Sequence, residues 1–172
     1  MFHVERTLPR LMDKRIIGLL VLFFIFSGCG GSRQSVQIPD YLLVPNGKEV
    51  TGNKALTAFI FENNLKKIPI EQYLADKFKV DNFQEREYWV SIDKDKYKIM
   101  IYDYNEFEKY FGSANYSVIN LEPDDVNVNE KRKFIAISMI NSYNEDCLTD
   151  RSIFQNIAVK YLKNLKDEYY NQ

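Results

Sequence analysis

The residues of this chain that could do chemistry are mostly carboxylates. The 172-residue sequence contains one histidine, His3, two cysteines, Cys29 and Cys147, and 24 aspartates and glutamates. No histidine follows residue 28, so the rest of the chain cannot build a Ser-His-Asp or Cys-His centre or a His-ligated zinc site. No glycine-rich phosphate-binding loop occurs either. The sequence therefore predicts no catalytic residue and no cofactor.

Two groups of acids remain as candidates for catalysis. Asp93 and Asp95 flank a predicted hairpin turn, and Asp103, Glu106 and Glu108 lie at the start of a predicted helix. A glycoside hydrolase needs two carboxylates about 5 to 9.5 Å apart in a cleft. The helix dipole gives a simpler reason for acids at a helix start. A carboxylate-based, glycan-directed hydrolase is therefore the alternative to a non-enzymatic domain.

Residues 125–129 place acidic and amide side chains at the spacing of a calcium-binding EF-hand loop. Positions 6 and 12 of such a loop are normally Gly and Glu, and here they are Glu130 and Ala136. We therefore predict a solvated loop and no metal site. The alternative is a looser calcium site formed by Asp124, Asp125 and Asn127.

Cys147 is flanked by Glu145 and Asp146, whose negative charges raise the pKa of a thiol and weaken it as a nucleophile. We predict an inert, half-buried thiol near a strand end. A redox centre and an intermolecular disulfide are the alternatives.

Aromatic residues make up 15% of the chain and supply the candidate binding surface. Trp89, Tyr102 and Tyr104 lie on or just after a predicted hairpin, and Trp89 and Tyr102 fall on the face opposite Val90 and Ile99. Tyrosine and tryptophan join an apolar ring to a polar group, which suits contacts with a protein or a glycan. The three residues are either this binding surface or part of a second core layer.

The elements that must position these residues follow from the hydrophobic pattern. Alternation predicts a hairpin over residues 86–101, and a run that is apolar on both faces predicts a central strand over 133–140. Pro69 opens a predicted helix whose apolar stripe ends at Phe78. Shorter strands are expected at 41–44, 57–62 and 116–121, and a short helix at 105–112.

The clearest predicted helix is the last one, with Thr149 or Asp150 as its N-cap. Its expected buried stripe consists of Ile153, Phe154, Ile157, Tyr161, Leu162 and Leu165. Together these elements predict an α+β fold, a mostly antiparallel sheet of about five strands with helices packed on one face.

The N-terminal segment predicts how the protein is held in the cell. Lys14 and Arg15 precede an apolar run at 16–26, which is too short to cross a bilayer as a helix, and small residues lead to Cys29. The sequence Phe-Ser-Gly-Cys resembles the lipobox of bacterial lipoproteins. This resemblance implies that residues 1–28, with Met12 as an alternative start, form a signal peptide and that Cys29 carries the lipid anchor, palmitate included.

An uncleaved membrane helix and a cleaved, freely secreted protein are the alternatives to this lipoprotein. Residues 29–37 are expected to form a flexible tether, followed by a single domain at 38–172. In lipoproteins of this kind an Asp after the lipidated Cys favours the inner membrane. Here the residue is Gly30, which implies the outer membrane, facing the periplasm.

Charge narrows the choice of partners. Residues 1–28 hold four basic and two acidic residues, so the remaining chain would carry 19 basic and 22 acidic residues, a net charge of −3. A mildly acidic surface with charges of both signs argues against nucleic acid as a partner. It also argues against binding to anionic lipid through a cluster of basic residues. The sequence therefore predicts a lipid-anchored envelope lipoprotein with a small, non-enzymatic binding or accessory domain, whose partner is an envelope protein or a glycan.

Overall fold

The apolar run that begins at Phe134 forms the central strand of the sheet. The computed structural model describes residues 36–50, 55–114, 116–117 and 133–172. Strand β7 (Phe134–Asn141) is buried along its whole length, as the sequence predicts for a strand covered on both faces. It pairs in antiparallel fashion with β3 (Ala58–Glu62) on one side and with β5 (Asp95–Ile101) on the other.

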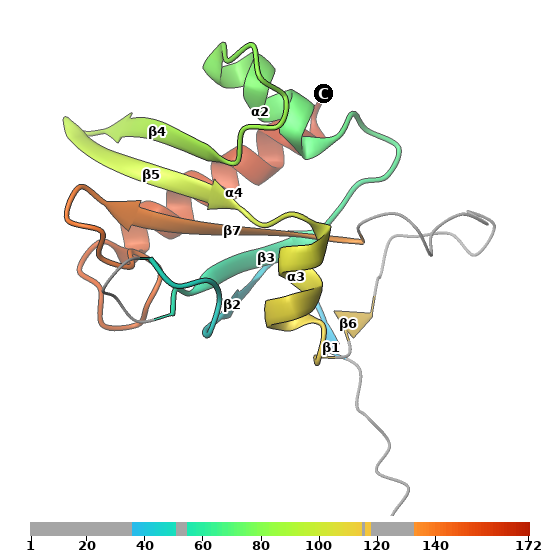
Figure 1. Ribbon diagram of the computed structural model, residues 1–172, viewed down its shortest axis with the longest axis horizontal. Helices are drawn as coiled ribbons and strands as arrows, with labels where there is room; N and C mark the ends of the chain where they lie inside the picture. Colours follow the sequence, from blue (N-terminus) through green and yellow to red (C-terminus); the bar gives the residue numbers. More distant parts are fainter. Residues whose placement is uncertain (1–35, 51–54, 115, 118–132) are drawn as a thin grey trace, which may run out of the picture. The chain divides into compact units, whose positions relative to one another are not determined.

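Two outer strands complete the sheet, whose order is β2-β3-β7-β5-β4 (Figure 1). They are β2 (Leu42–Val44) and β4 (Glu87–Ile92), and every neighbouring pair of strands is antiparallel. Asp93 and Lys94 form a two-residue turn between β4 and β5, and their φ values of 49° and 77° suit the primed turns of tight hairpins. The predicted α+β class, with an antiparallel sheet of five strands, is confirmed.

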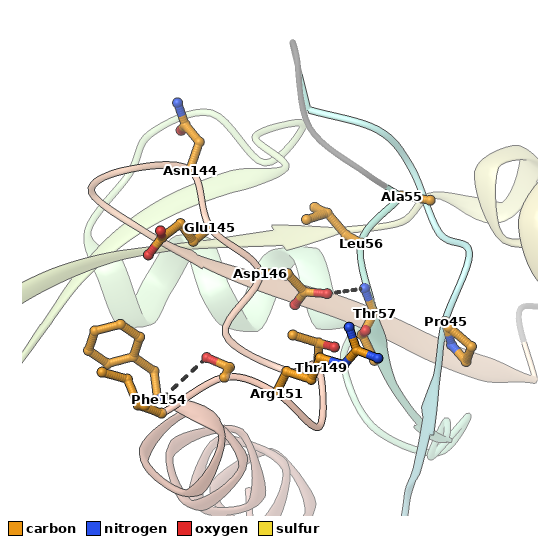
Figure 2. A pocket seen from close by; sticks show the side chains of 12 residues that line it. Pro45, Ala55, Leu56, Thr57, Asn144, Glu145, Asp146, Thr149, Arg151 and Phe154 are labelled. Atoms are coloured by element: carbon orange, nitrogen blue, oxygen red, sulfur yellow. Dashed lines mark hydrogen bonds between the residues drawn. The ribbon is translucent and has the colours of Figure 1, made fainter.

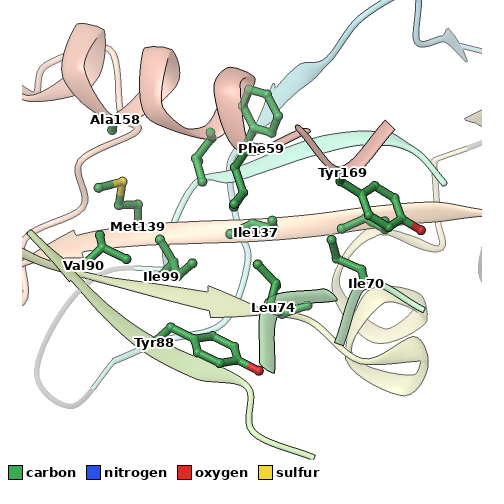
Figure 3. Close-up of a cluster of buried hydrophobic side chains, with 14 of the residues drawn as sticks. Phe59, Ile70, Leu74, Tyr88, Val90, Ile99, Ile137, Met139, Ala158 and Tyr169 are labelled. Atoms are coloured by element: carbon green, nitrogen blue, oxygen red, sulfur yellow. The ribbon is translucent and has the colours of Figure 1, made fainter. Parts of the chain in front are cut away.

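Helices α2 (Ile70–Phe78) and α4 (Gln155–Tyr170) cover one face of this sheet. Their apolar stripes pack against the alternate strand residues that point to this face, and together they form the larger hydrophobic core (Figure 3). Phe59 of β3 and Ile137 of β7 lie at its centre, and Leu74 of α2 and Leu162 of α4 close it from the helix side.

Helix α3 (Tyr104–Phe111) packs on the opposite face. Asp103 and Glu106 form a capping box at its start, and Phe107 and Phe111 contact a second core that includes Phe134 of β7. The expectation that the helices share one face therefore holds for α2 and α4 and not for α3. The reason is that β3 and β7 are apolar on both sides, so both faces of the sheet need a cover.

Strand β1 (Val36–Gln37) pairs in parallel with β6 (Tyr116–Ser117) outside the main sheet. The sequence placed Val36 and Gln37 in the flexible tether, but this pairing makes them part of the folded domain. Strand β6 confirms the start of the predicted strand at 116–121, and residues 118–121 lie outside the described residues.

Helix α4 begins later than the sequence predicts. Its N-cap position is Phe154, whose backbone N–H donates to Ser152 Oγ at 3.2 Å, so Thr149 and Asp150 are not its cap. Because residues 149–154 form turns, two residues of the expected stripe lie outside the core: Ile153 is 86% exposed and Ile157 is 37% exposed. Leu162 and Leu165 are buried as expected, and Phe154 and Tyr161 are partly buried against the larger core. The other buried residues of α4 are Ala158, Lys166 and Tyr169. No helix in the described part of the chain is long and apolar enough to span a membrane.

Candidate functional site

The three aromatic residues predicted as a binding surface do not lie together. Trp89 is 57% exposed on the sheet face opposite α2 and α4, with Lys98 Nζ 5.1 Å from its ring centroid. Tyr104 is 47% exposed at the start of α3, where it lines a hollow beside Ile68 and Pro69. Tyr102 is fully buried in the second core, so it cannot line a surface. Of the two predicted alternatives, an exposed surface applies to Trp89 and Tyr104, and a second core layer applies to Tyr102.

The Tyr102 hydroxyl has a structural role. It accepts a hydrogen bond from the backbone N–H of Lys48 at 3.0 Å and lies 2.8 Å from Ser138 Oγ, which donates to the backbone carbonyl of Thr57. Burial raises the pKa of Tyr102, so the phenol stays neutral. Its hydroxyl group has a hydrogen-bond donor in Lys48 and an acceptor in Ser138. This chain of bonds joins the segment after β2 to the sheet.

A pocket with a volume of about 660 Å³ lies between the loop that joins β7 to α4 and the segment around Pro45 and Leu56 (Figure 2). This size falls in the usual range of ligand pockets, roughly 300–1,000 Å³. We therefore take this loop pocket as the candidate functional site.

The loop that forms one wall of the pocket is held by its own hydrogen bonds. Asn141 Oδ1 accepts bonds from the backbone N–H groups of Tyr143 and Glu145, and Asn144 adopts a left-handed conformation with φ of 60°. The N–H of Cys147 donates to the carbonyl of Met139 at 2.9 Å. These contacts fix the wall before any ligand binds.

The two acids of the pocket are occupied by structural contacts. Asp146 accepts hydrogen bonds from the backbone N–H of Thr57 at 2.7 Å and from that of Leu148 at 2.8 Å. Glu145 accepts a bond from the side-chain amide of Asn141 at 2.7 Å, and its side chain points away from that of Asp146 (Figure 2). The pair therefore braces the loop and does not face a common point as a catalytic pair would.

What the pocket offers a ligand is an apolar base with a polar rim. Phe154 supplies apolar surface, Leu56 lines the pocket as a buried residue, and Ile153 stands exposed at the edge. Thr149 and Arg151 supply donors at the rim (Figure 2), and Arg151 forms no salt bridge with any described residue. Such a lining suits an apolar group that carries a hydrogen-bond acceptor or a negative charge.

The other residues singled out from the sequence take structural positions. Asp103 and Glu106 cap α3, and Glu106 also pairs with Lys48 at 3.3 Å. Cys147 is a free, fully buried thiol, and burial together with Asp146 and Glu145 raises its pKa to about 12. The thiol was predicted to be half-buried and is buried completely. The loop at 124–130 lies outside the described residues, and none of the described His, Cys, Asp and Glu form a cluster that could hold a metal ion.

The loop pocket was missed at the level of sequence because its walls are far apart in the chain. The hydrogen bond between Thr57 and Asp146 joins residues 89 positions apart. The only local signal was the polar run from Asn141 to Asp146, which is typical of any connecting loop. Comparison with known proteins adds no further signal, because no family model, no curated protein and no solved structure matches this chain.

Proposed function

We propose that this chain is a lipid-anchored lipoprotein of the cell envelope whose domain binds a protein partner and carries out no catalysis itself. The support for the anchor is the resemblance to a lipobox that ends in Cys29, and Gly30 favours the outer membrane, facing the periplasm. Two or more acyl chains on one cysteine hold an otherwise soluble domain stably on a bilayer.

The observation that carries the binding role is the loop pocket with exposed apolar side chains at its edge. Ile153 is 86% exposed beside the pocket, and Tyr143, 82% exposed, precedes the pocket residue Asn144. Apolar side chains around a preformed hollow are typical of protein contact sites. The acids of the pocket already accept structural hydrogen bonds, Asp146 from backbone N–H groups and Glu145 from the side-chain amide of Asn141, which favours binding over the alternative of carboxylate catalysis.

Site-specific photo-cross-linking in the native envelope tests this proposal. With benzoylphenylalanine in place of Ile153, the full chain should give one adduct of defined mass. Arg151→Glu in the same chain should reduce the adduct at least fivefold, because it reverses the charge at the rim. The matched control places the cross-linker at Phe83, which is 55% exposed in the connection between α2 and β4. Identical adducts from both positions, or none from either, would contradict the proposal.

A further inference from the structure

We propose a second binding site: the groove between edge strand β2 and helix α4 takes an extended, acidic peptide segment as an additional strand of the sheet. This edge groove differs from the loop pocket in its place and in the ligand it fits. The proposal therefore goes beyond the function proposed above and does not depend on it.

The first argument is the direction in which the backbone groups of Leu43 point. The N–H of Asn63 donates to the carbonyl of Lys133 at 2.8 Å, so this pair is hydrogen-bonded in the register of β3 and β7. Hydrogen-bonded and non-bonded pairs alternate along antiparallel strands, so Ile60, three residues before Asn63, is not bonded to β7. Its backbone N–H and C=O point instead to its partner Leu42 in β2. The N–H and C=O of Leu43 therefore point out of the sheet, and no described strand pairs with β2 on that side.

The second argument is the shape of the surface beside this edge. A groove of about 390 Å³ lies between β2 and α4 and reaches from Gln155 to Asp167. Its apolar strip is formed by Tyr41, Leu43 and Val159, which are partly buried against the larger core. A strand added to β2 would direct every second side chain toward α4, into this groove.

The third argument is charge. Lys160 lines the groove, is exposed, and forms no salt bridge with any described residue. Lys163, one turn further along α4, pairs with Asp40 at 2.9 Å and keeps 42% of its side chain exposed. Asp167, the acid of the groove, already pairs with Lys166 at 3.4 Å. The unmatched charge of the groove is therefore positive, which favours a carboxylate on the ligand.

The aromatic side chain of the groove argues for a peptide and against a glycan. Glycan sites use a free aromatic face for stacking, but one face of Tyr41 is stacked on Phe59 with centroids 4.5 Å apart and an angle of 12°. Lys163 Nζ lies 5.3 Å from the centroid of the same ring. The groups left for a ligand are the backbone of Leu43, the apolar strip, Lys160 and the amides of Asn156 and Asn164.

The test uses two dye-labelled nine-residue probes. One is Thr-Val-Thr-Glu-Thr-Val-Thr-Val-Thr, in which Glu lies on the same face of the strand as the Val side chains, and the other has Lys in place of this Glu. Their binding to the purified full chain is measured by fluorescence anisotropy. We expect saturable binding of the Glu probe and at least tenfold weaker binding of the Lys probe. Lys160→Glu should reverse this preference. Equal affinity for the two probes, or no saturable binding of either below about 1 mM, roughly the weak end of specific binding, would overturn the proposal.

A backbone variant tests the added strand itself. Leu43→Pro removes the outward N–H, and proline is tolerated at such a position of an edge strand. This change should weaken the Glu probe at least tenfold, whereas Leu43→Ala, which shortens the side chain but keeps the N–H, should weaken it less. Circular dichroism checks that both variants fold. If folded Leu43→Pro binds like the unchanged chain, no strand is added at β2 and the proposal fails.

Discussion

At the scale of single residues, Gly47 allows the segment after β2 to reach the sheet. A Cβ atom on this residue would collide with the Tyr102 hydroxyl and would lie 2.8 Å from the carbonyl oxygen of Leu56. The N–H of Gly47 donates to the same carbonyl at 2.8 Å, and the next N–H, of Lys48, donates to Tyr102. Because Pro45 and Leu56 line the loop pocket, this approach also sets one wall of the candidate site.

We therefore expect Gly47→Ala to lower the free energy of unfolding by about 2 kcal/mol, within the range of overpacked sites. Tyr102→Phe alone should cost about 1–2 kcal/mol, because it removes the buried hydrogen bond to Ser138 and takes away the acceptor of the Lys48 N–H. In the Tyr102→Phe background, Gly47→Ala should cost less than in the unchanged chain, since one colliding atom is gone. Chemical denaturation of the four proteins measures this coupling, and strictly additive costs would show that Tyr102 does not limit the approach.

At the scale of elements, Asp40 joins the segment before β2 to helix α4. Its carboxylate pairs with Lys163 at 2.9 Å and with the buried Lys166. Partial burial by itself would raise the pKa of Asp40, but the hydrogen bonds and charges of Lys166 and Lys163 outweigh it, so that the pKa lies below its ordinary value of 3.8. The ionised carboxylate therefore stabilises the fold above about pH 4, and this contribution is lost as the pH falls through the lowered pKa.

Asp40→Asn should accordingly lower the free energy of unfolding at pH 7 by about 1 kcal/mol, the upper end for partly exposed pairs. The difference in the free energy of unfolding between the variant and the unchanged chain should shrink as the pH falls from 5 to 2. The reason is that the Asp40 carboxyl becomes neutral in both the folded and the unfolded chain. Urea denaturation at a series of pH values measures it. A difference that stays constant with pH would mean that packing, and not charge, connects Asp40 to α4.

The elements that could be predicted from the sequence are those with a local hydrophobic pattern. The β4–β5 hairpin, central strand β7 and helix α2 were predicted because each has a local hydrophobic period. The start of α4 was wrong because Ile153 and Phe154 continue the helical pattern although the chain still forms turns there. The side of the sheet that α3 covers depends on tertiary contacts of Phe107 and Phe111, which no local pattern reveals.

The same limit applies to the sites. Trp89, Tyr102 and Tyr104 were predicted to form either a binding surface or part of a second core layer, and strand alternation could not decide between the two. In the structure Trp89 and Tyr104 are exposed and Tyr102 is buried. The loop pocket joins segments that meet only in the folded chain, and the edge groove depends on which strand ends the sheet. Neither property is encoded within one stretch of sequence.

At the scale of the whole molecule, the folded domain begins close to the proposed anchor. Strand β1 starts at Val36, seven residues after Cys29. A fully extended chain of this length spans at most about 25 Å. If Cys29 carries lipid, the partners of this domain must therefore be found within a short distance of the membrane surface, among envelope proteins.

Lipid attachment to Cys29 is the claim on which this account of the whole molecule rests, and metabolic labelling with an alkyne analogue of palmitate tests it most directly. The chain has only one other cysteine, and Cys147, which is fully buried, supplies the matched control. In growing cells the unchanged chain and Cys147→Ala should both incorporate the label into a protein shortened at its N-terminus. Cys29→Ala should incorporate none and should accumulate as the longer precursor. Undiminished labelling of Cys29→Ala would contradict the account.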